Sequence, residues 1–302
     1  MTISDFEFLL DDRLQKIRQI ITKYNEDNFY ISFSGGRDST VLRDLIDRAI
    51  PGNNIPSVHI NTGIELKSIE DFVKECAKHD NRVKIIKPQE NIKKVLSKYG
   101  YPFKSKRHSK ILSQFQRNVD GETIHNYLQD EQKTKDWGSF LVCPKILKYQ
   151  FSSDFNIKVS DKCCEYIKEK PLKKWSFENA KPFAIIGVMR AEGGRRTKAN
   201  CLAFRNNKLT AFQPLAPLPN EFIYKYIDYF NIDTADLYKP PYNFQRTGCK
   251  GCPFAIDIEN ELRILKKFFP AEHKQALQIW GDIYNEYYRI SYRIKDKDVI
   301  EK

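Results

Sequence analysis

The hydrophobic pattern alternates between helical and strand spacing through the first half of the chain and again near residue 185. Apolar residues recur at intervals of three and four over residues 5–24, which predicts an amphipathic helix. After it, short β-prone runs alternate with helical ones, a pattern typical of parallel strands joined by crossover helices. We therefore predict an α/β layered fold. The predicted strands are 29–33, 56–60, 83–86 and 183–188, and the predicted helices are 40–50, 69–79 and 92–99.

The rest of the chain follows other patterns. Residues 100–160 are less regular and rich in polar and basic residues, which indicates an insertion or a mobile segment. Two β-prone runs around Asn206-Asn207 predict a hairpin. The region after Pro214 is mainly helical and closes with a long helix at 271–292. The predicted organisation is an N-terminal helix (1–24), an α/β domain (25–213) with a basic insertion at about 100–160, and a helical C-terminal region (214–302).

A glycine-containing loop directly follows the first predicted strand and opens a helix. Two adjacent glycines let consecutive backbone N–H groups face an anion, and the helix N-terminus adds partial positive charge. Arg37 can clamp a phosphate with two hydrogen bonds, and Asp38 fits either a helix cap or a magnesium ligand. The sequence therefore predicts a phosphate-binding loop. Its residues are Ser34, Gly35, Gly36, Arg37, Asp38, Ser39 and Thr40.

The Ser-Gly-Gly-x-Asp-Ser part of this loop resembles the PP-loop of the adenine nucleotide alpha hydrolase superfamily. In that superfamily the loop holds the pyrophosphate of ATP while chemistry occurs at the α-phosphate. The resemblance implies a parallel layered sheet of that superfamily's type, an ATP site with Mg²⁺, and catalytic roles for Arg37 and Asp38. Arg37 stands where lysine is usual, which keeps the charge and changes the geometry.

Two later segments resemble the phosphoadenosine phosphosulfate reductase family within that superfamily. Residues 59–65 resemble its Asn/Asp-Thr-Gly segment, and residues 186–196 resemble its Gly-x-Arg-x-x-Glu-Ser segment, in which arginine faces the nucleotide phosphates. Gly193-Gly194 replaces the usual serine, and Arg195 and Arg196 fit either this role or surface charges. The resemblance implies that Asn61, Thr62, Gly63 and Arg190 bind the nucleotide, and that Arg190 is also catalytic.

Seven cysteines are too few for a disulfide scaffold, and four of them form two pairs in the sequence. Four thiolates can hold a [4Fe-4S] cluster or a structural zinc ion. The adjacent pair followed by Cys-x-x-Cys resembles the cluster site of adenylyl sulfate reductases and related sulfur-inserting enzymes, which implies iron; zinc and metal-free thiols stay open. The expected ligands are Cys163, Cys164, Cys249 and Cys252, whereas Cys76, Cys143 and Cys201 are predicted to be packed thiols.

Charge points to polyanionic partners. The chain has 51 Lys and Arg against 39 Asp and Glu, a net charge of +12. Residues 87–110 hold eight of these bases against one acid, with aromatic residues between them, a composition typical of a groove that follows a nucleic-acid strand. A solvated helix face followed by a basic loop explains the segment almost as well. No apolar run reaches the ~20 residues of a membrane span, and the start lacks a basic export signal, so we expect a cytoplasmic protein without a membrane partner.

Three functions fit these patterns. The first is ATP-dependent adenylyl transfer to an acceptor, with release of pyrophosphate and subsequent iron–sulfur-assisted sulfur transfer, as in tRNA thiolases and the DNA phosphorothioation enzyme. The second is reduction of adenylyl sulfate or phosphoadenylyl sulfate. The third is a non-catalytic nucleotide- or nucleic-acid-binding module with a structural metal. The complete loop favours the first, as does the lack of any cysteine after Cys252. The expected partners are an adenine nucleotide, tRNA or DNA through residues 87–110, and a protein that donates sulfur or electrons.

Overall fold

The computed structural model describes residues 1–119, 121–129 and 142–301, and these fold into two compact units. The first unit contains residues 1–61, 65–88 and 170–247, and the second contains residues 62–64, 89–169 and 248–302. Each unit therefore combines segments that are distant in the sequence. The domain boundaries expected at residues 24/25 and 213/214 stay predictions.

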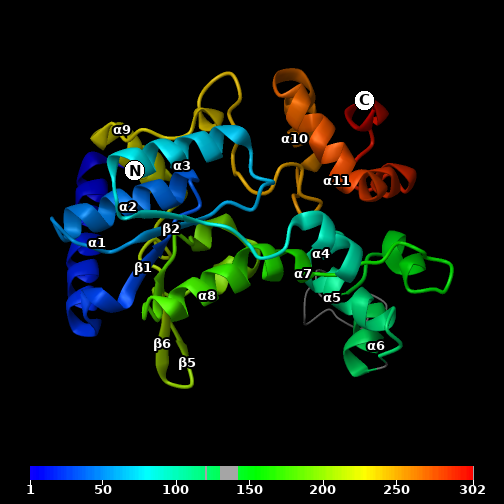
Figure 1. Ribbon diagram of the computed structural model, residues 1–302, viewed down its shortest axis with the longest axis horizontal. Helices are drawn as coiled ribbons and strands as arrows, with labels where there is room; N and C mark the ends of the chain where they lie inside the picture. The colour runs from blue at the N-terminus through cyan, green and yellow to red at the C-terminus, as the bar shows by residue number, and fades with distance from the viewer. Residues whose placement is uncertain (120, 130–141, 302) are drawn as a thin grey trace. The chain divides into compact units, whose positions relative to one another are not determined.

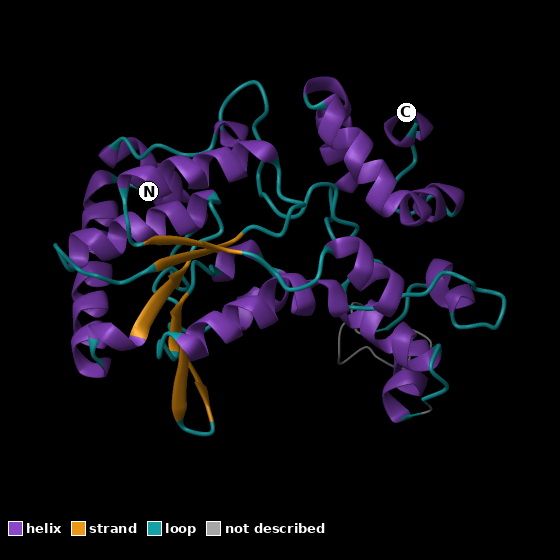
Figure 2. Cartoon of the chain, in the orientation of Figure 1, coloured by secondary structure: helices purple, strands orange, loops and turns teal. Residues whose placement is uncertain are grey.

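The first unit is built on one six-stranded sheet, in the order β3-β2-β1-β4-β6-β5. All neighbouring strands are parallel except β5 and β6, which form the predicted hairpin (Figure 2). The α/β class with a parallel sheet is thus confirmed. The strands are β1 (Phe29–Ser32), β2 (Ser57–Ile60), β3 (Val83–Ile86), β4 (Phe183–Ile185), β5 (Leu202–Arg205) and β6 (Lys208–Phe212).

Helices cover both faces of this sheet, so its central strands are buried on each side (Figure 1). The main core packs α1, α2 and α9 against one face, with Phe6 and Ile17 of α1 fully buried. On the other face, Trp175 of α8 packs edge-on against Tyr30 of β1 at 5.6 Å between ring centroids. The helices of this unit are α1 (Ile3–Tyr24), α2 (Arg37–Ala49), α3 (Lys67–His79), α8 (Lys170–Glu178) and α9 (Asn220–Phe230).

Strands β1 and β4 are parallel neighbours, with Ile31 opposite Ile185. Their carboxyl ends therefore meet at one edge of the sheet, where α/β proteins bind ligands. Strand β4 ends at Ile185, three residues before the predicted end at residue 188. Beyond it the chain turns over the start of α2: a Cβ added to Gly187 would lie 3.3 Å from the carbonyl oxygen of Asp38. The glycine permits this close approach.

The second unit is mainly helical. Two of its helices, α5 and α6, lie within the segment that the sequence predicted to be irregular. The N-cap of α5 is Ser105, whose hydroxyl accepts a hydrogen bond from the backbone N–H of His108. Residues 120 and 130–141 of that segment lie outside the described residues. In the described part of the chain, no helix combines the length and apolarity needed to cross a membrane. The helices of this unit are α4 (Ile92–Tyr99), α5 (Lys106–Phe115), α6 (Glu122–Leu128), α7 (Lys162–Cys164), α10 (Ile258–Phe268) and α11 (Pro270–Arg289).

Candidate functional site

The glycine loop between β1 and α2 has a conformation that few sequences can adopt. Gly35 has φ +73°, in the left-handed region that favours glycine. A Cβ at this position would lie 2.6 Å from Cγ2 of Val73 and 2.9 Å from Cγ2 of Ile69, both on α3. The loop is therefore pressed against α3, and both conformation and space require glycine at this position.

Hydroxyl groups fix the loop to the first turn of α2. The Oγ atoms of Ser34 and Ser39 lie 2.9 Å apart, the N–H of Gly36 donates to Ser34 Oγ at 3.2 Å, and Ser39 Oγ donates to the carbonyl of Gly36 at 2.8 Å. Helix α2 begins at Arg37, three residues before the predicted start. Its N-cap is Gly36, which offers no side chain to the helix N-terminus. This end of the helix is suited to bind an anion instead of a capping side chain.

A cavity of about 260 Å³ opens over the loop, entirely within the first unit. Its walls come from the loop, from residues 186–188 after β4, and from the segment 245–247. Five of the seven predicted loop residues, Ser34 and Gly36 to Ser39, line it. The phosphate loop and the end of β4 thus meet at the edge of the sheet.

Two arginines line this cavity, and one carboxylate holds both. For Arg196 the sequence left a phosphate-facing role and a surface role open, and for Arg246 it predicted no role. Glu192 Oε1 accepts a hydrogen bond from Arg196 and another from Arg246, while Glu192 Oε2 accepts from the N–H of Met189 at 3.2 Å. The carboxylate is nearly buried, with 8% of its side chain exposed, whereas about half of each guanidinium-bearing side chain is exposed. Glu192 therefore orients two cations that remain open to solvent.

Arg190, the arginine that was predicted to bind the nucleotide from residues 186–196, contacts another part of the chain. Its Nε donates to the carbonyl of Ala199 at 2.6 Å, and it is not among the residues that line the cavity. Arg196, six residues later, lines the cavity. Arg196 is thus the arginine of this segment that lines the cavity, and the nucleotide-binding and catalytic roles of Arg190 stay predictions.

Arg37 lines the cavity and is held by aromatic rings. Its guanidinium carbon lies 4.2 Å from the centroid of Tyr224, and Nη2 donates to the carbonyl of Gln245 at 3.3 Å. Its Nε is buried, makes no hydrogen bond and lies 3.7 Å from Asp38 Oδ1. Burial raises the pKa of Asp38, and the charge of Arg37 opposes that rise. The loop thus presents one partly buried carboxyl beside one cation.

The Asn-Thr-Gly turn does not line this cavity. Asn61 belongs to the first unit, where its side-chain amide donates to Glu70 Oε1 at 3.1 Å. Thr62 and Gly63 belong to the second unit, in which the next carbonyl, that of Ile64, accepts from the N–H of Lys250 at 2.7 Å. Their nucleotide-binding roles stay predictions.

All four cysteines predicted as ligands belong to the second unit. Cys163 and Cys164 lie on α7, and Cys249 and Cys252 form a turn in which the N–H of Cys252 donates to the carbonyl of Cys249 at 3.1 Å. Gly251, within this turn, has φ +59°.

Helix α11 holds the Cys-x-x-Cys turn through its backbone. Trp280 Nε1 donates to the carbonyl of Lys250 at 3.0 Å, the hydroxyl of Tyr284 donates to the carbonyl of Gly251, and the hydroxyl of Tyr287 donates to that of Pro253 at 2.8 Å. Three aromatic donors thus satisfy buried carbonyls around the two cysteines, as buried polar groups require. The turn is fixed by the fold of the second unit itself.

The four thiols are close enough to influence one another's ionisation. Its hydrogen bond with Cys164 raises the pKa of Cys163, as do its burial and the negative charge of the other three thiols. Burial and the charges of Cys249 and Cys164 likewise raise the pKa of Cys252. A hydrogen bond from Cys163, helped by nearby lysines, lowers the pKa of Cys164 to about 6. Among the described residues, no three Cys, His, Asp or Glu side chains are arranged as ligands of a metal ion.

Burial acts on the pKa values of the other three cysteines in one direction. Burial raises the pKa of Cys76, of Cys201 and of Cys143, the last to about 11. Cys143 is buried and Cys201 packs against the main core, in agreement with the prediction of packed thiols. A thiol with a raised pKa is a poor nucleophile at neutral pH.

Comparison with known proteins identifies the family. The family model of the phosphoadenosine phosphosulfate reductase domain matches residues 28–137 and 144–255. The chain belongs to this family. The resemblance drawn from the glycine loop and the later segments is thus confirmed, together with the PP-loop superfamily to which the family belongs.

Individual relatives share little sequence identity with this chain. It is 25% identical to an uncharacterized protein of Methanocaldococcus jannaschii over 93% of its own length, and it spans 56% of that relative. It is similar to phosphoadenylyl-sulfate reductase from Candida auris (12% identity, TM-score 0.45, 82% of this chain and 96% of that one). It is also similar to the U34-tRNA thiolase NcsA from Methanococcus maripaludis, solved with its [4Fe-4S] cluster (14% identity, TM-score 0.41, 95% and 80%).

Proposed function

We propose that this chain is an ATP-dependent adenylyl-transfer enzyme that activates an acceptor for iron–sulfur-assisted sulfur transfer. The observation that carries the proposal is the cavity over the glycine loop, where the N-terminus of α2 faces the arginine pair held by Glu192. An uncapped helix end and two oriented guanidinium groups match the charge of a polyphosphate. A pyrophosphate is part of ATP and is absent from adenylyl sulfate.

In this proposal, each group of residues around the cavity has a separate role in adenylyl transfer. The loop hydroxyls and the N–H groups of α2 bind the β- and γ-phosphates, and Asp38 holds the Mg²⁺ that accompanies them. An acceptor oxygen attacks the α-phosphorus, the bond from that phosphorus to the oxygen bridging it to the β-phosphate breaks, and pyrophosphate leaves. Arg196 and Arg246 stabilise the negative charge that develops on the leaving group. A sulfur nucleophile from a donor protein then displaces AMP.

The four clustered cysteines fit a [4Fe-4S] cluster by their chemistry. They supply four thiols within one unit, two on α7 and two in a turn fixed by α11, and Lys106 and Lys168 contribute positive charge that favours the thiolate of Cys164. When bound, the cluster would supply a site for handling sulfur beside these residues. Zinc on the same thiols is the alternative, and it would serve only as a structural link.

Sulfonucleotide reduction is the second candidate, because the family takes its name from that reaction. It requires a thiolate nucleophile to attack the sulfate sulfur. The three cysteines outside the proposed cluster site have pKa values raised by burial, which argues against this role. Adenylyl transfer needs no such nucleophile.

Exchange of radiolabelled pyrophosphate into ATP tests the proposal, with total cellular RNA or sheared DNA supplied as acceptor. We expect Mg²⁺-dependent exchange in the intact protein and a loss of about tenfold or more in Arg246→Gln, because hydrogen bonds to charged groups contribute roughly 1.5–3 kcal/mol. Arg205→Gln is the matched control, since Arg205 is an exposed arginine on the β5–β6 hairpin. Release of sulfite from adenylyl sulfate without any exchange would establish the reductase instead.

A further inference from the structure

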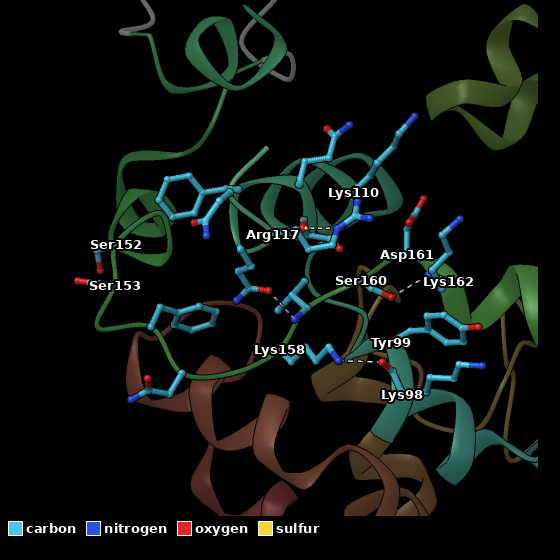
Figure 3. A pocket seen from close by; sticks show the side chains of 18 of the residues that line it. Lys98, Tyr99, Lys110, Arg117, Ser152, Ser153, Lys158, Ser160, Asp161 and Lys162 are labelled. Carbon is cyan, nitrogen blue, oxygen red and sulfur yellow. Dashed lines mark hydrogen bonds between the residues drawn. The ribbon is translucent and has the colours of Figure 1, made fainter. Parts of the chain in front are cut away.

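The second unit contains a cavity much larger than the one over the glycine loop, with a volume of about 1150 Å³ (Figure 3). Residues 98–99 of α4, α5 with the turn after it, the segment 152–161, and Lys162 and Glu165 at α7 line this cavity. Ordinary small-molecule pockets have volumes of roughly 300–1,000 Å³. This space thus exceeds the needs of one nucleotide and suits a longer ligand.

Positive charge dominates the lining. Lys110 and Arg117 come from one side of the cavity, and Lys98 and Lys158 come from the opposite side (Figure 3). A fifth cation, Lys162, is paired with the carboxylate of Glu165 at 2.6 Å. The only other acid among the described lining residues is Asp161. Facing cations with few acids favour a ligand that carries several negative charges along its length.

Aromatic and hydrogen-bonding side chains lie between these cations. Tyr99 lines the cavity with its ring stacked on Tyr166, at 4.4 Å between centroids. Phe115 and Phe155 also line it, together with serine hydroxyls and the amide of Asn156. Aromatic faces stack on bases of any sequence, and cations follow the phosphates, so the combination is typical of single-strand binding. A duplex would bury its bases away from such rings.

Hydrogen bonds hold the walls of the cavity in place. Tyr101 N–H donates to the carbonyl of Lys158 at 2.8 Å, and a Cβ on Gly100 would lie 2.6 Å from that same carbonyl oxygen. On the other side, Gln116 Nε2 donates to the carbonyl of Ile157 at 2.8 Å and its Oε1 accepts from the N–H of Val159 at 3.0 Å. The segment that forms one wall is thus fixed at both edges.

The cavity also borders the paired cysteines. Asp161, Lys162 and Glu165 line it, and in the sequence they flank Cys163 and Cys164 directly. We infer that this cavity binds a single-stranded stretch of nucleic acid, the acceptor of the reaction, and delivers it to the segment that carries these thiols. The inference rests on the proposed function in one respect, since that function supplies the reason for an acceptor.

Fluorescence anisotropy with labelled 12-nucleotide RNA, the same sequence as DNA, and the matching duplex tests this inference. The full-length protein should bind a single strand more tightly than the duplex, and the RNA and DNA probes identify which nucleic acid is the acceptor. Lys110→Gln with Arg117→Gln should weaken binding about tenfold or more. It should also reduce the slope of log affinity against log salt by about 1.4, because each phosphate contact to a single strand contributes about 0.7.

Lys173→Gln with Lys208→Gln is the matched control, because it removes two exposed lysines of the first unit. Equal weakening in both double variants, tighter binding to the duplex, or no binding to either strand would overturn the inference. Mg-ATP binding, measured on the same samples, should be unchanged in all variants. If the unmodified protein bound neither strand but still exchanged pyrophosphate, the inference about this cavity would be refuted and the proposed function would stand. Strand binding without any exchange would refute the proposed function alone.

Discussion

Replacing Gly35 by alanine should destabilise the first unit through two separable effects. The backbone at φ +73° disfavours any residue with a Cβ, at a cost of about 1–2 kcal/mol. The added methyl would also lie 2.6 Å from Val73 and 2.9 Å from Ile69, and forcing a methyl into a packed core costs roughly 1–3 kcal/mol. We expect a total loss of about 2–5 kcal/mol in the free energy of unfolding.

Gly52 provides the control, because it has nearly the same backbone angle, φ +76°, and no atom within 4 Å of an added Cβ. Gly52→Ala should therefore cost only the backbone part. Urea unfolding followed by circular dichroism measures both variants, and Gly35→Ala should lose about 1–3 kcal/mol more. The double variant Gly35→Ala with Val73→Ala should lose less unfolding free energy than the sum of the losses in the two single variants. Equal losses for Gly35→Ala and Gly52→Ala would refute the close packing of the loop on α3.

Three further predictions follow from charge and burial. Burial raises the pKa of Asp38, so the folded state holds its proton more tightly than the unfolded chain and loses stability as pH rises. Asp38→Asn should therefore raise the melting temperature at pH 7, and it should weaken Mg-ATP binding. Calorimetry measures both quantities, and unchanged values for both would contradict this prediction. Cys252→Ser should lower the iron bound after anaerobic reconstitution, whereas Cys201→Ser, which removes a thiol packed against the main core, should keep it; equal iron in both variants would exclude Cys252 as a ligand. Burial lowers the pKa of His108 from 6.5 to about 3, so between these values the unfolded chain binds a proton that the folded chain does not bind. The free energy of unfolding should therefore fall by about 1 kcal/mol between pH 7 and 5.5. His108→Gln should flatten that dependence in denaturant titrations, and an unchanged slope would show that another group is responsible.

The sheet and its glycine loop could be predicted because their signals are local. Buried parallel strands require short runs of apolar residues, and the hairpin turn requires residues such as Asn206 and Asn207, which have φ of 49° and 59°. Helix α5 carried no such signal, because His108 and Ser109 are polar and fully buried. His108 is satisfied there by the hydroxyl of Tyr127 and the amide oxygen of Gln150, which are distant in the sequence.

The arginine pair of the phosphate cavity could not be read from the sequence for the same reason. Arg196 and Arg246 are separated by 50 positions, and only the fold brings both to Glu192. The sequence left the role of Arg196 open between phosphate binding and a surface charge, and the segment of Arg246 was noted only for its cysteine pair. A carboxylate with two arginine partners has no fixed spacing in sequence, whereas a glycine loop does.

Competition between nucleotides for the cavity over the glycine loop tests the central claim most directly. The protein is equilibrated with a fluorescent ATP analogue and Mg²⁺, and ATP, pyrophosphate, adenylyl sulfate and AMP are added in turn as competitors. Adenylyl transfer predicts that ATP displaces the probe at a concentration at least tenfold lower than adenylyl sulfate does, and that pyrophosphate alone competes. Tighter binding of adenylyl sulfate, with no competition from pyrophosphate, would contradict the account.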